Sequence, residues 1–187
     1  MKVVVVTGTP GVGKTTVLNH SLEKIGSSFN IINFGDAMFE VAEKEGIAED
    51  RDELRKQPPA IQKKIQSLAA RKIAKEAEKS NIIVDTHCTV KTPKGYLPGL
   101  PRWVLEELNP DTIILIEADP EDIVARRSGD PARARDAEDV ASLEEHQQMN
   151  RAIAMAYAMF TGATVKLVRN NTDELEKAAE DMADALR

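Results

Sequence analysis

A glycine-rich segment near the start of the chain carries a lysine and threonines at a spacing that suits phosphate chemistry. Gly8, Gly13, Lys14 and Thr15 fit every fixed position of the pattern G-x-x-x-x-G-K-[ST]. Glycines let the backbone turn tightly, so that its N–H groups point at phosphate oxygens. Lys14 can then reach the terminal phosphates of a nucleoside triphosphate, and the Thr15 hydroxyl can bind the Mg²⁺ that bridges them. The segment therefore predicts an ATP or GTP site.

The elements expected on either side of this segment are those that such a site requires. Residues 3–6 are consecutive valines, a β-branched run that suits a strand buried on both faces. A helix is expected to begin at Thr15, so that its positive dipole end faces the phosphates. The alternative, a glycine-rich turn with a solvated lysine, does not explain why the glycines, Lys14 and Thr15 fall into one register. Strand, loop and helix together favour the nucleotide site.

A carboxylate ends the strand expected over residues 81–85. Asp85 at that point can hold Mg²⁺ through water, next to Thr15. An ordinary turn aspartate at a strand end is the alternative. Because the chain also carries a phosphate-binding loop, the metal role is favoured, with Thr15 and Asp85 as the protein's metal-binding residues.

Residues 126–136 form an arginine-rich connection between two expected helices, and it also contains glycine and proline. The planar guanidinium binds phosphate oxygens through two parallel hydrogen bonds and keeps its charge. Such a segment can close over a phosphoryl group and exclude water. The alternative is a solvated loop neutralised by nearby carboxylates: Asp130, Asp136, Glu138 and Asp139. The order of the motifs, a phosphate loop first and an arginine-rich connection later, favours a lid.

Two other segments hold side chains that suit a second, phosphate-bearing substrate. Residues 49–56 are densely charged, and Arg55 is well placed to hold a phosphate, with a plain surface helix as the alternative. His87 follows a strand end, where a structural histidine is the commoner case and a phosphate or base contact the functional one. His87, Cys88 and His146 show neither metal-ligand spacing nor a nucleophile–base pattern.

The long helix expected over residues 141–160 is rich in alanine and methionine. Its apolar residues at helical spacing are predicted to face the core: Met149, Ile153, Ala156 and Phe160. Asn150 and Arg151 interrupt this composition and are candidates to face the nucleotide cleft. Met155 and Met159 lie off the apolar stripe and are candidates for a subunit contact.

Length and composition restrict the class of protein. The chain has 187 residues, of which 42% are apolar and 30% charged, and this is typical of one soluble globular domain. Its net charge of −6 argues against a general nucleic-acid binder, whose footprint is usually basic. Cys88 is the only cysteine, which excludes an internal disulfide and suits a reducing cytosol. Neither a membrane-spanning run nor a signal peptide is expected.

Apolar strand-like runs alternate with longer amphipathic stretches along the whole chain. Strands are expected over residues 3–6, 30–34, 81–85, 112–117 and 164–168. Helices are expected over residues 15–25, 37–45, 49–56, 59–79, 103–108, 120–127, 141–160 and 173–187. Gly35 and Asp36 are expected to cap the second helix, and residues 86–101 to form a loop. This pattern predicts an α/β fold with a five-stranded parallel sheet and helices on both faces.

Ligands in such sheets bind at the carboxyl ends of the strands. The segments that follow the strands are therefore expected along one edge: residues 7–16, 34–36, 85–89 and 117–119.

Several of these stretches resemble one enzyme family, the archaeal adenylate kinases, a branch of the nucleoside monophosphate kinases. The matching stretches are residues 5–16, 33–42, 49–56, 84–101, 144–151 and 161–166. The phosphate loop is common to many nucleotide-binding enzymes, whereas residues 84–101 are far more specific to this family. The resemblance implies a P-loop NTPase fold with one kinase domain over residues 1–187. Within it, the resemblance places an insert for the monophosphate at about 35–75 and a short arginine-rich lid at about 127–139.

The resemblance further implies the reaction ATP + AMP ⇌ 2 ADP with Mg²⁺, carried out by a cytoplasmic homotrimer. From the charge and the hydropathy described above, neither a nucleic-acid nor a membrane partner is expected. Carried over by position, it implies that the ATP phosphates are bound by Gly8, Thr9, Pro10, Gly11, Val12, Gly13, Lys14, Thr15 and Thr16. It assigns to the AMP side Phe34, Gly35, Asp36, Met38, Arg55, Thr86 and His87. The catalytic charges expected on the migrating phosphoryl group are Lys14, Arg126, Arg133 and Arg135.

Two alternatives stay open beside this interpretation. One is another monophosphate kinase acting on CMP, UMP or dTMP. The other is a nucleotide-dependent interaction or assembly ATPase, which a degraded lid or second-substrate segment would indicate. A GTPase is disfavoured, because residues 109–111 and 170–173 approach the guanine motif Asn-Lys-x-Asp but lack its lysine.

Overall fold

The computed structural model describes residues 1–26, 29–128 and 139–187. At its centre lies a five-stranded sheet in the order β2–β3–β1–β6–β7, in which every neighbouring pair is parallel. The strands are β1 (Val3–Gly8), β2 (Phe29–Asn33), β3 (Asn81–Asp85), β6 (Thr112–Glu117) and β7 (Thr164–Arg169). The predicted fold class and all five predicted parallel strands are confirmed.

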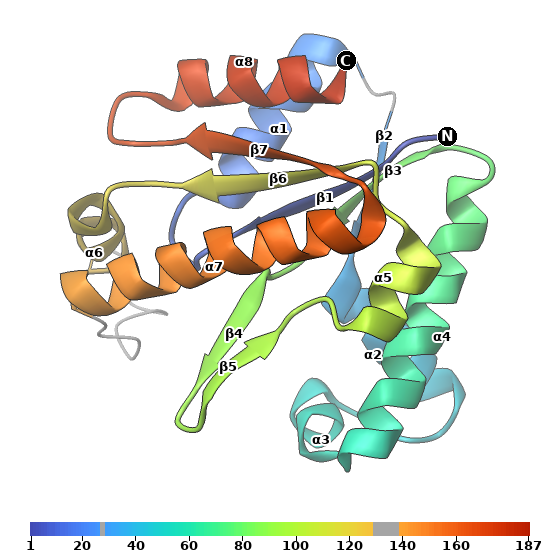
Figure 1. Cartoon of the computed structure of the whole chain (residues 1–187). Helices are drawn as coiled ribbons and strands as arrows, with labels where there is room; N and C mark the ends of the chain where they lie inside the picture. The colour runs from blue at the N-terminus through green and yellow to red at the C-terminus, as the bar shows by residue number, and fades with distance from the viewer. Residues whose placement is uncertain (27–28, 129–138) are drawn as a thin grey trace.

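The valine run of β1 shows why this strand takes the central position. Val3 and Val5 pack into one hydrophobic cluster, and Val4 and Val6 into another on the opposite face. A strand buried on both faces gains apolar burial from every residue, so it favours β-branched side chains throughout. One face is covered by α4 (Pro59–Ala77), α5 (Arg102–Leu108) and α7 (Val140–Thr161), and the other by α1 (Lys14–Ile25) and α8 (Leu175–Leu186), as Figure 1 shows.

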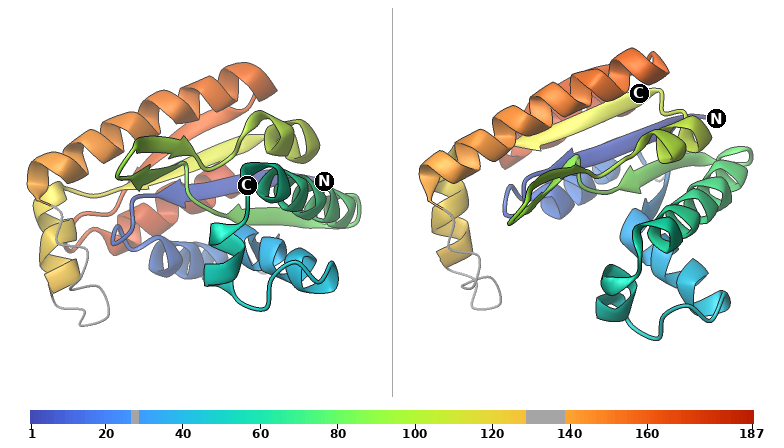
Figure 2. Two further views of the ribbon diagram at one scale, coloured as in Figure 1. Left: turned by 90° about the horizontal axis from the view of Figure 1, so that it is seen from below. Right: turned by 60° about the horizontal axis from the view of Figure 1, so that its bottom comes forward.

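Three helices follow β2 and leave the sheet: α2 (Phe34–Lys44), α3 (Arg51–Lys56) and the first turns of α4. These helices lie together beside the sheet, as Figure 2 shows. They enclose a small hydrophobic cluster of their own, which contains Leu54 and Ile65. The Asn33 side chain caps α2 by accepting a 3.1 Å hydrogen bond from the Asp36 N–H. The expectation that Gly35 and Asp36 cap this helix is therefore wrong. Asn33 is a strong cap residue at the strand end, so the helix begins directly after it.

The segment expected as a loop over residues 86–101 contains a hairpin. Its antiparallel strands are β4 (Thr89–Thr92) and β5 (Gly95–Pro98), paired from Thr89 with Pro98 to Thr92 with Gly95. These strands are short and mostly exposed, so they lack the apolar alternation that identifies a half-buried strand. The predicted loop is corrected to a hairpin, which Figure 1 shows projecting from the sheet.

The predicted core face of α7 is only partly right. Ile153 packs against the core and Met149 is half-buried, but Ala156 is exposed and the exposed fraction of Phe160 is 47%. The fully buried residues of the helix are Leu143, His146, Gln147, Asn150, Ala154, Tyr157 and Ala158. The buried face is partly polar because hydrogen bonds satisfy its side chains, and a count of apolar residues does not detect such a face. Met155 and Met159 are exposed, at 53% and 86%.

The short helix α6 (Pro120–Ser128) leads into the expected lid and contains its first residues. Most of that lid, including Arg133 and Arg135, lies outside the described residues. No helix in the described ranges is long and apolar enough to cross a membrane.

Candidate active site

The loop between β1 and α1 is shaped by glycines that no other residue can replace without strain. A Cβ at Gly8 would lie 2.5 Å from the carbonyl oxygen of Ile116 on the neighbouring strand. Gly13 has a φ of +83°, and a Cβ there would lie 2.5 Å from Nδ2 of Asn170. The loop thus takes its shape from close backbone approaches as well as from its own turn.

Side chains from distant parts of the chain hold the carbonyl groups of this loop. Asn170 donates from Nδ2 to the Val12 carbonyl at 2.8 Å, and Arg126 donates to the same oxygen at 3.3 Å. Arg127, only 7% exposed, donates from Nε to the Pro10 carbonyl at 3.0 Å. Since carbonyls of the loop are held by donors outside it, its N–H groups can serve an anion.

Lys14 connects the phosphate loop to the end of β3. Its ammonium donates to the Thr86 carbonyl at 2.9 Å and forms an ion pair with Asp85. Asn33, at the end of β2, donates to the other oxygen of Asp85 at 3.2 Å. The carboxyl ends of three adjacent strands therefore meet at this point. A cavity of about 490 Å³ lies there, lined by Gly8, Thr9, Pro10, Gly11, Val12, Gly13, Lys14, Thr15, Thr16, Asn33, Asp85, His87, Arg126 and Arg127.

The pKa of His87 is shifted by its surroundings in this cavity. Desolvation by the surrounding protein lowers the pKa of His87, and the Lys14 ammonium lowers it further, while Asp85 acts in the opposite direction. The lowered pKa keeps the imidazole neutral at pH 7, so it can form hydrogen bonds but carries no charge to the site.

The donor set at Thr15 and Asp85 fits Mg²⁺. Both residues line the same cavity, and each offers an oxygen, the ligand atom that Mg²⁺ prefers. Asp85 Oδ1 is buried, and the Lys14 ammonium forms the ion pair with it. No group of three or more His, Cys, Asp or Glu in the described residues could hold a metal. A Mg²⁺ ion here would therefore complete its coordination from phosphate and water.

The residues expected on the AMP side fall into two groups. Thr86 and His87 lie at the phosphate loop, through the contacts described above. Phe34, Gly35, Asp36 and Met38 belong to the first turns of α2, where Phe34 is buried in the core and Asp36 pairs with Arg51. Arg55 lies on α3, with 74% of its side chain exposed and a 2.8 Å ion pair to Asp52. None of the second group lines the phosphate-loop cavity.

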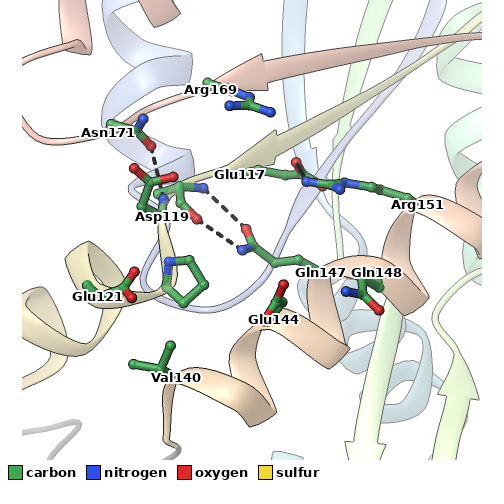
Figure 3. Close-up of a pocket in the computed structure, with 12 residues that line it drawn as sticks. Glu117, Asp119, Glu121, Val140, Glu144, Gln147, Gln148, Arg151, Arg169 and Asn171 are labelled. Carbon is green, nitrogen blue, oxygen red and sulfur yellow. Dashed lines mark hydrogen bonds and ion pairs between the residues drawn. The ribbon is translucent and has the colours of Figure 1, made fainter.

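A second cavity, of about 320 Å³, lies where β6 and β7 end beside α7 (Figure 3). Arg151 donates to both oxygens of Glu117, at 2.7 and 2.6 Å, and these bonds raise the pKa of Arg151. Gln147 binds the backbone of Ala118 twice, accepting from its N–H at 3.2 Å and donating to its carbonyl at 3.0 Å. These contacts attach α7 to the start of α6. Of the pair expected at the cleft, Arg151 faces this cavity and Asn150 faces the phosphate loop.

Arg127 and Asn170 were not singled out as site residues from the sequence. Asn170 directly follows β7, so the rule that strand ends gather at one edge could have identified it. For Arg127, the only signal in the sequence is its position in the arginine-rich stretch.

Comparison with known proteins agrees with this geometry. Residues 7–144 match a family described as an AAA domain. The chain is 54% identical to an adenylate kinase of Methanocaldococcus jannaschii, with 100% of this chain and 98% of that protein covered. It is 55% identical to an adenylate kinase of Methanococcus vannielii, over 99% of this chain and 98% of that protein.

Solved structures share the fold. A shikimate kinase from Bacteroides thetaiotaomicron matches with a TM-score of 0.53 at 14% identity, covering 99% of this chain and 98% of that one. A sugar kinase from Janibacter sp. matches with a TM-score of 0.52 at 18% identity, covering 100% of this chain and 94% of that one. At such identities these matches concern the fold alone.

Proposed function

This chain belongs to the adenylate kinase family, and from that membership we propose that it transfers the terminal phosphoryl group of ATP to AMP, reversibly, to give two ADP. The observation that carries this function is full-length identity of 53–55% to archaeal adenylate kinases. It is supported by the phosphate loop, whose shape depends on Gly8 and Gly13 and whose Lys14 lines the cavity.

The proposed mechanism needs little covalent chemistry from the protein. A phosphate oxygen of AMP attacks the γ-phosphorus of ATP while the bond to the bridging oxygen of ADP breaks, so no protein nucleophile is required. Lys14 and Arg126, with Arg133 and Arg135 from the lid, stabilise the charge of the migrating group. The loop N–H groups from Gly8 to Thr16 orient the triphosphate for in-line transfer.

The substrates divide the chain into regions under this proposal. ATP takes the phosphate loop, AMP takes an insert at about residues 35–75, and a lid at about 127–139 closes over the transferred group. The AMP side comprises Phe34, Gly35, Asp36, Met38, Arg55, Thr86 and His87. Neutral His87 suits a position between the two nucleotides, where a hydrogen-bonding group orients a phosphate.

Mg²⁺ is the proposed cofactor, held by Thr15 and, through water, by Asp85. When bound, it would supply positive charge that offsets the negative charge of the phosphate groups during transfer. The proposal is supported by the cavity that Thr15 and Asp85 both line, because each residue offers an oxygen to it.

We also propose a cytoplasmic homotrimer. Apolar side chains stay exposed toward the end of α7 and on the edge strand β7, namely Met155, Met159, Phe160 and Leu167, the last at 47%. Covering them in a subunit contact would remove apolar surface from water. Light scattering after gel filtration tests this: a mass near three chains is expected, and a monomer contradicts it. The lone thiol Cys88 suits a reducing compartment.

A phosphoryl-transfer assay with Mg-ATP against AMP, CMP, UMP, GMP and dTMP tests the function. Diphosphate formation with AMP, at least about tenfold faster than with the other monophosphates, is the expected result. Preference for CMP, UMP or dTMP would leave the fold in place and change the named substrate. ATP binding without transfer to any monophosphate would contradict the kinase function and favour a nucleotide-dependent interaction protein.

A further inference from the structure

A buried amide on α7 contacts the phosphate loop and the segment after β3 at the same time. Asn150, only 1% exposed, donates from Nδ2 to the Thr9 hydroxyl at 3.3 Å. Its Oδ1 accepts a 2.6 Å hydrogen bond from the Thr89 hydroxyl. Its backbone carbonyl accepts from the Cys88 thiol at 3.4 Å. One side chain therefore joins two segments that are 80 positions apart in the sequence.

His146, one turn earlier on α7, extends this network to the hairpin. Its Nε2 lies 3.1 Å from the Thr89 hydroxyl and 3.4 Å from the Thr89 carbonyl. A carbonyl only accepts, and the single hydroxyl proton of Thr89 is directed at Asn150, so Nε2 carries the proton and donates. The ring of Tyr96 on β5 packs against the imidazole, with centroids 5.3 Å apart.

Burial of these side chains favours one arrangement of the two segments. Thr9, Thr89 and His146 are exposed by only 2%, 4% and 5%. A buried polar group that loses its partner destabilises the fold, because water cannot replace the bond. The two segments are therefore held at one separation, the one at which both hydroxyls reach the Asn150 amide.

The segments that Asn150 joins belong to the two sides of the site. Thr9 is part of the phosphate loop, whereas Thr89 follows two residues after His87. The Thr86 carbonyl, in the same short segment, holds the Lys14 ammonium at 2.9 Å. A shift of this segment relative to the loop would therefore move Lys14 and His87 together.

We propose that Asn150 is a positioning residue for phosphoryl transfer, which acts through Thr9 and Thr89 to set the separation between the ATP loop and the segment that carries Thr86 and His87. This inference rests on the proposed function. In this proposal Asn150 acts through Thr9 and Thr89 and not on the substrate itself. Displacement by about 1 Å at a site of this kind costs up to about 100-fold in rate, so its loss lowers kcat more than it raises KM.

The test compares N150A and T89V with T89S, which keeps the hydroxyl that donates to Asn150. Turnover with Mg-ATP and AMP, both KM values and Tm are measured for each. N150A and T89V are expected to lower kcat by about tenfold or more, with each KM changed by less than about threefold. T89S is expected to keep at least about half of the wild-type kcat, because its hydroxyl reaches the same partner.

Y157F is the matched control. Tyr157 lies on the buried face of the same helix and donates to the Cys88 carbonyl at 2.9 Å, but no hydrogen bond of the described residues joins it to the phosphate loop. It should lower Tm to a similar extent and leave kcat within about twofold of wild type. If N150A and T89V lower Tm but keep kcat, or if Y157F lowers kcat as much as they do, the positioning role is wrong.

Amide hydrogen exchange supplies a readout that needs no turnover. Exchange in residues 9–13 should be at least about fivefold faster in T89V than in Y157F and T89S. Equal exchange rates in T89V, Y157F and T89S would overturn the inference. This test does not depend on whether N150A folds. A wild-type chain that transfers no phosphoryl group would instead refute the proposed function, so the two failures are distinguishable.

Discussion

The two nucleotide sides proposed for this enzyme are built in different ways. The phosphate loop is held by buried contacts from α6, α7 and the segment after β7, through Arg127, Asn150 and Asn170. The insert after β2 instead carries ion pairs on its surface, such as Arg55 with Asp52 and Lys72 with Glu40. Buried polar contacts each have one satisfied geometry, whereas exposed pairs are readily replaced by water.

Because of this difference, substitutions in the two regions should affect stability and substrate binding differently. Changes in the phosphate loop should impair folding and catalysis together, because its shape depends on the same close contacts as its chemistry. Loss of an exposed side chain of the insert that binds AMP should impair AMP binding and leave folding nearly unchanged. Four substitutions test the comparison.

The largest effect is expected for K14A. Removing the ammonium takes away the positive charge beside the transferred group and should lower kcat by about 10²–10³-fold. K24A is its control on the same helix, since Lys24 pairs with Glu176 away from the loop, and it should stay within about twofold of wild type. Steady-state kinetics with Mg-ATP and AMP measure both. If K14A kept a turnover close to that of the wild type, the assignment of this loop to the ATP phosphates would be wrong.

R55A should raise KM for AMP by about tenfold or more, because a charged hydrogen bond to the AMP phosphate is worth about 1.5–3 kcal/mol. KM for ATP and the free energy of unfolding should hardly change, since Arg55 is exposed and its ion pair to Asp52 contributes little. D52A, which removes only the partner, should leave KM for AMP within about twofold. Unchanged AMP kinetics in R55A would remove Arg55 from the AMP side.

Gly13→Ala should lower the free energy of unfolding by about 2–4 kcal/mol, as left-handed backbone strain adds to the displacement of Asn170. Gly162 is the matched control: its φ is +80°, close to the +83° of Gly13, but nothing lies within 4 Å of a Cβ there. Gly162→Ala should therefore cost about 1 kcal/mol from strain alone. Urea unfolding measures both. Equal losses would mean that the contact with Asn170 adds nothing.

The smallest effect is expected for K72Q on the insert. The hydrogen bond from Lys72, and then its charge, lower the pKa of Glu40 below its usual 4.5. The stability from this pair is therefore present above about pH 4.5 and is lost as pH falls through the lowered pKa. At pH 7 the substitution should lower Tm by about 1–2 °C, because both side chains are exposed. At pH 2 the difference should vanish, and a difference that persists there would indicate packing in place of charge.

Local signals in the sequence were sufficient to predict the phosphate loop and the central strand that precedes it. The register of Gly8, Gly13, Lys14 and Thr15 predicted the phosphate loop, and the valine run predicted a strand buried on both faces. Both depend on spacings of a few residues, where backbone geometry dictates residue type. The four-residue strands of the hairpin, which begin at Thr89 and Gly95, are not predictable in this way. They bury too few side chains to produce an alternating apolar pattern in the sequence.

Only the tertiary structure decided what holds the loop in place. Arg127, Asn150 and Asn170 lie 117, 141 and 158 positions from the loop residues that they bind. The same distance in sequence explains why the buried face of α7 is only partly predictable: its polar side chains are buried because their partners lie on other segments. Hydrogen bonds between such distant segments follow from the packing of strands and helices around the sheet, and no local spacing records them.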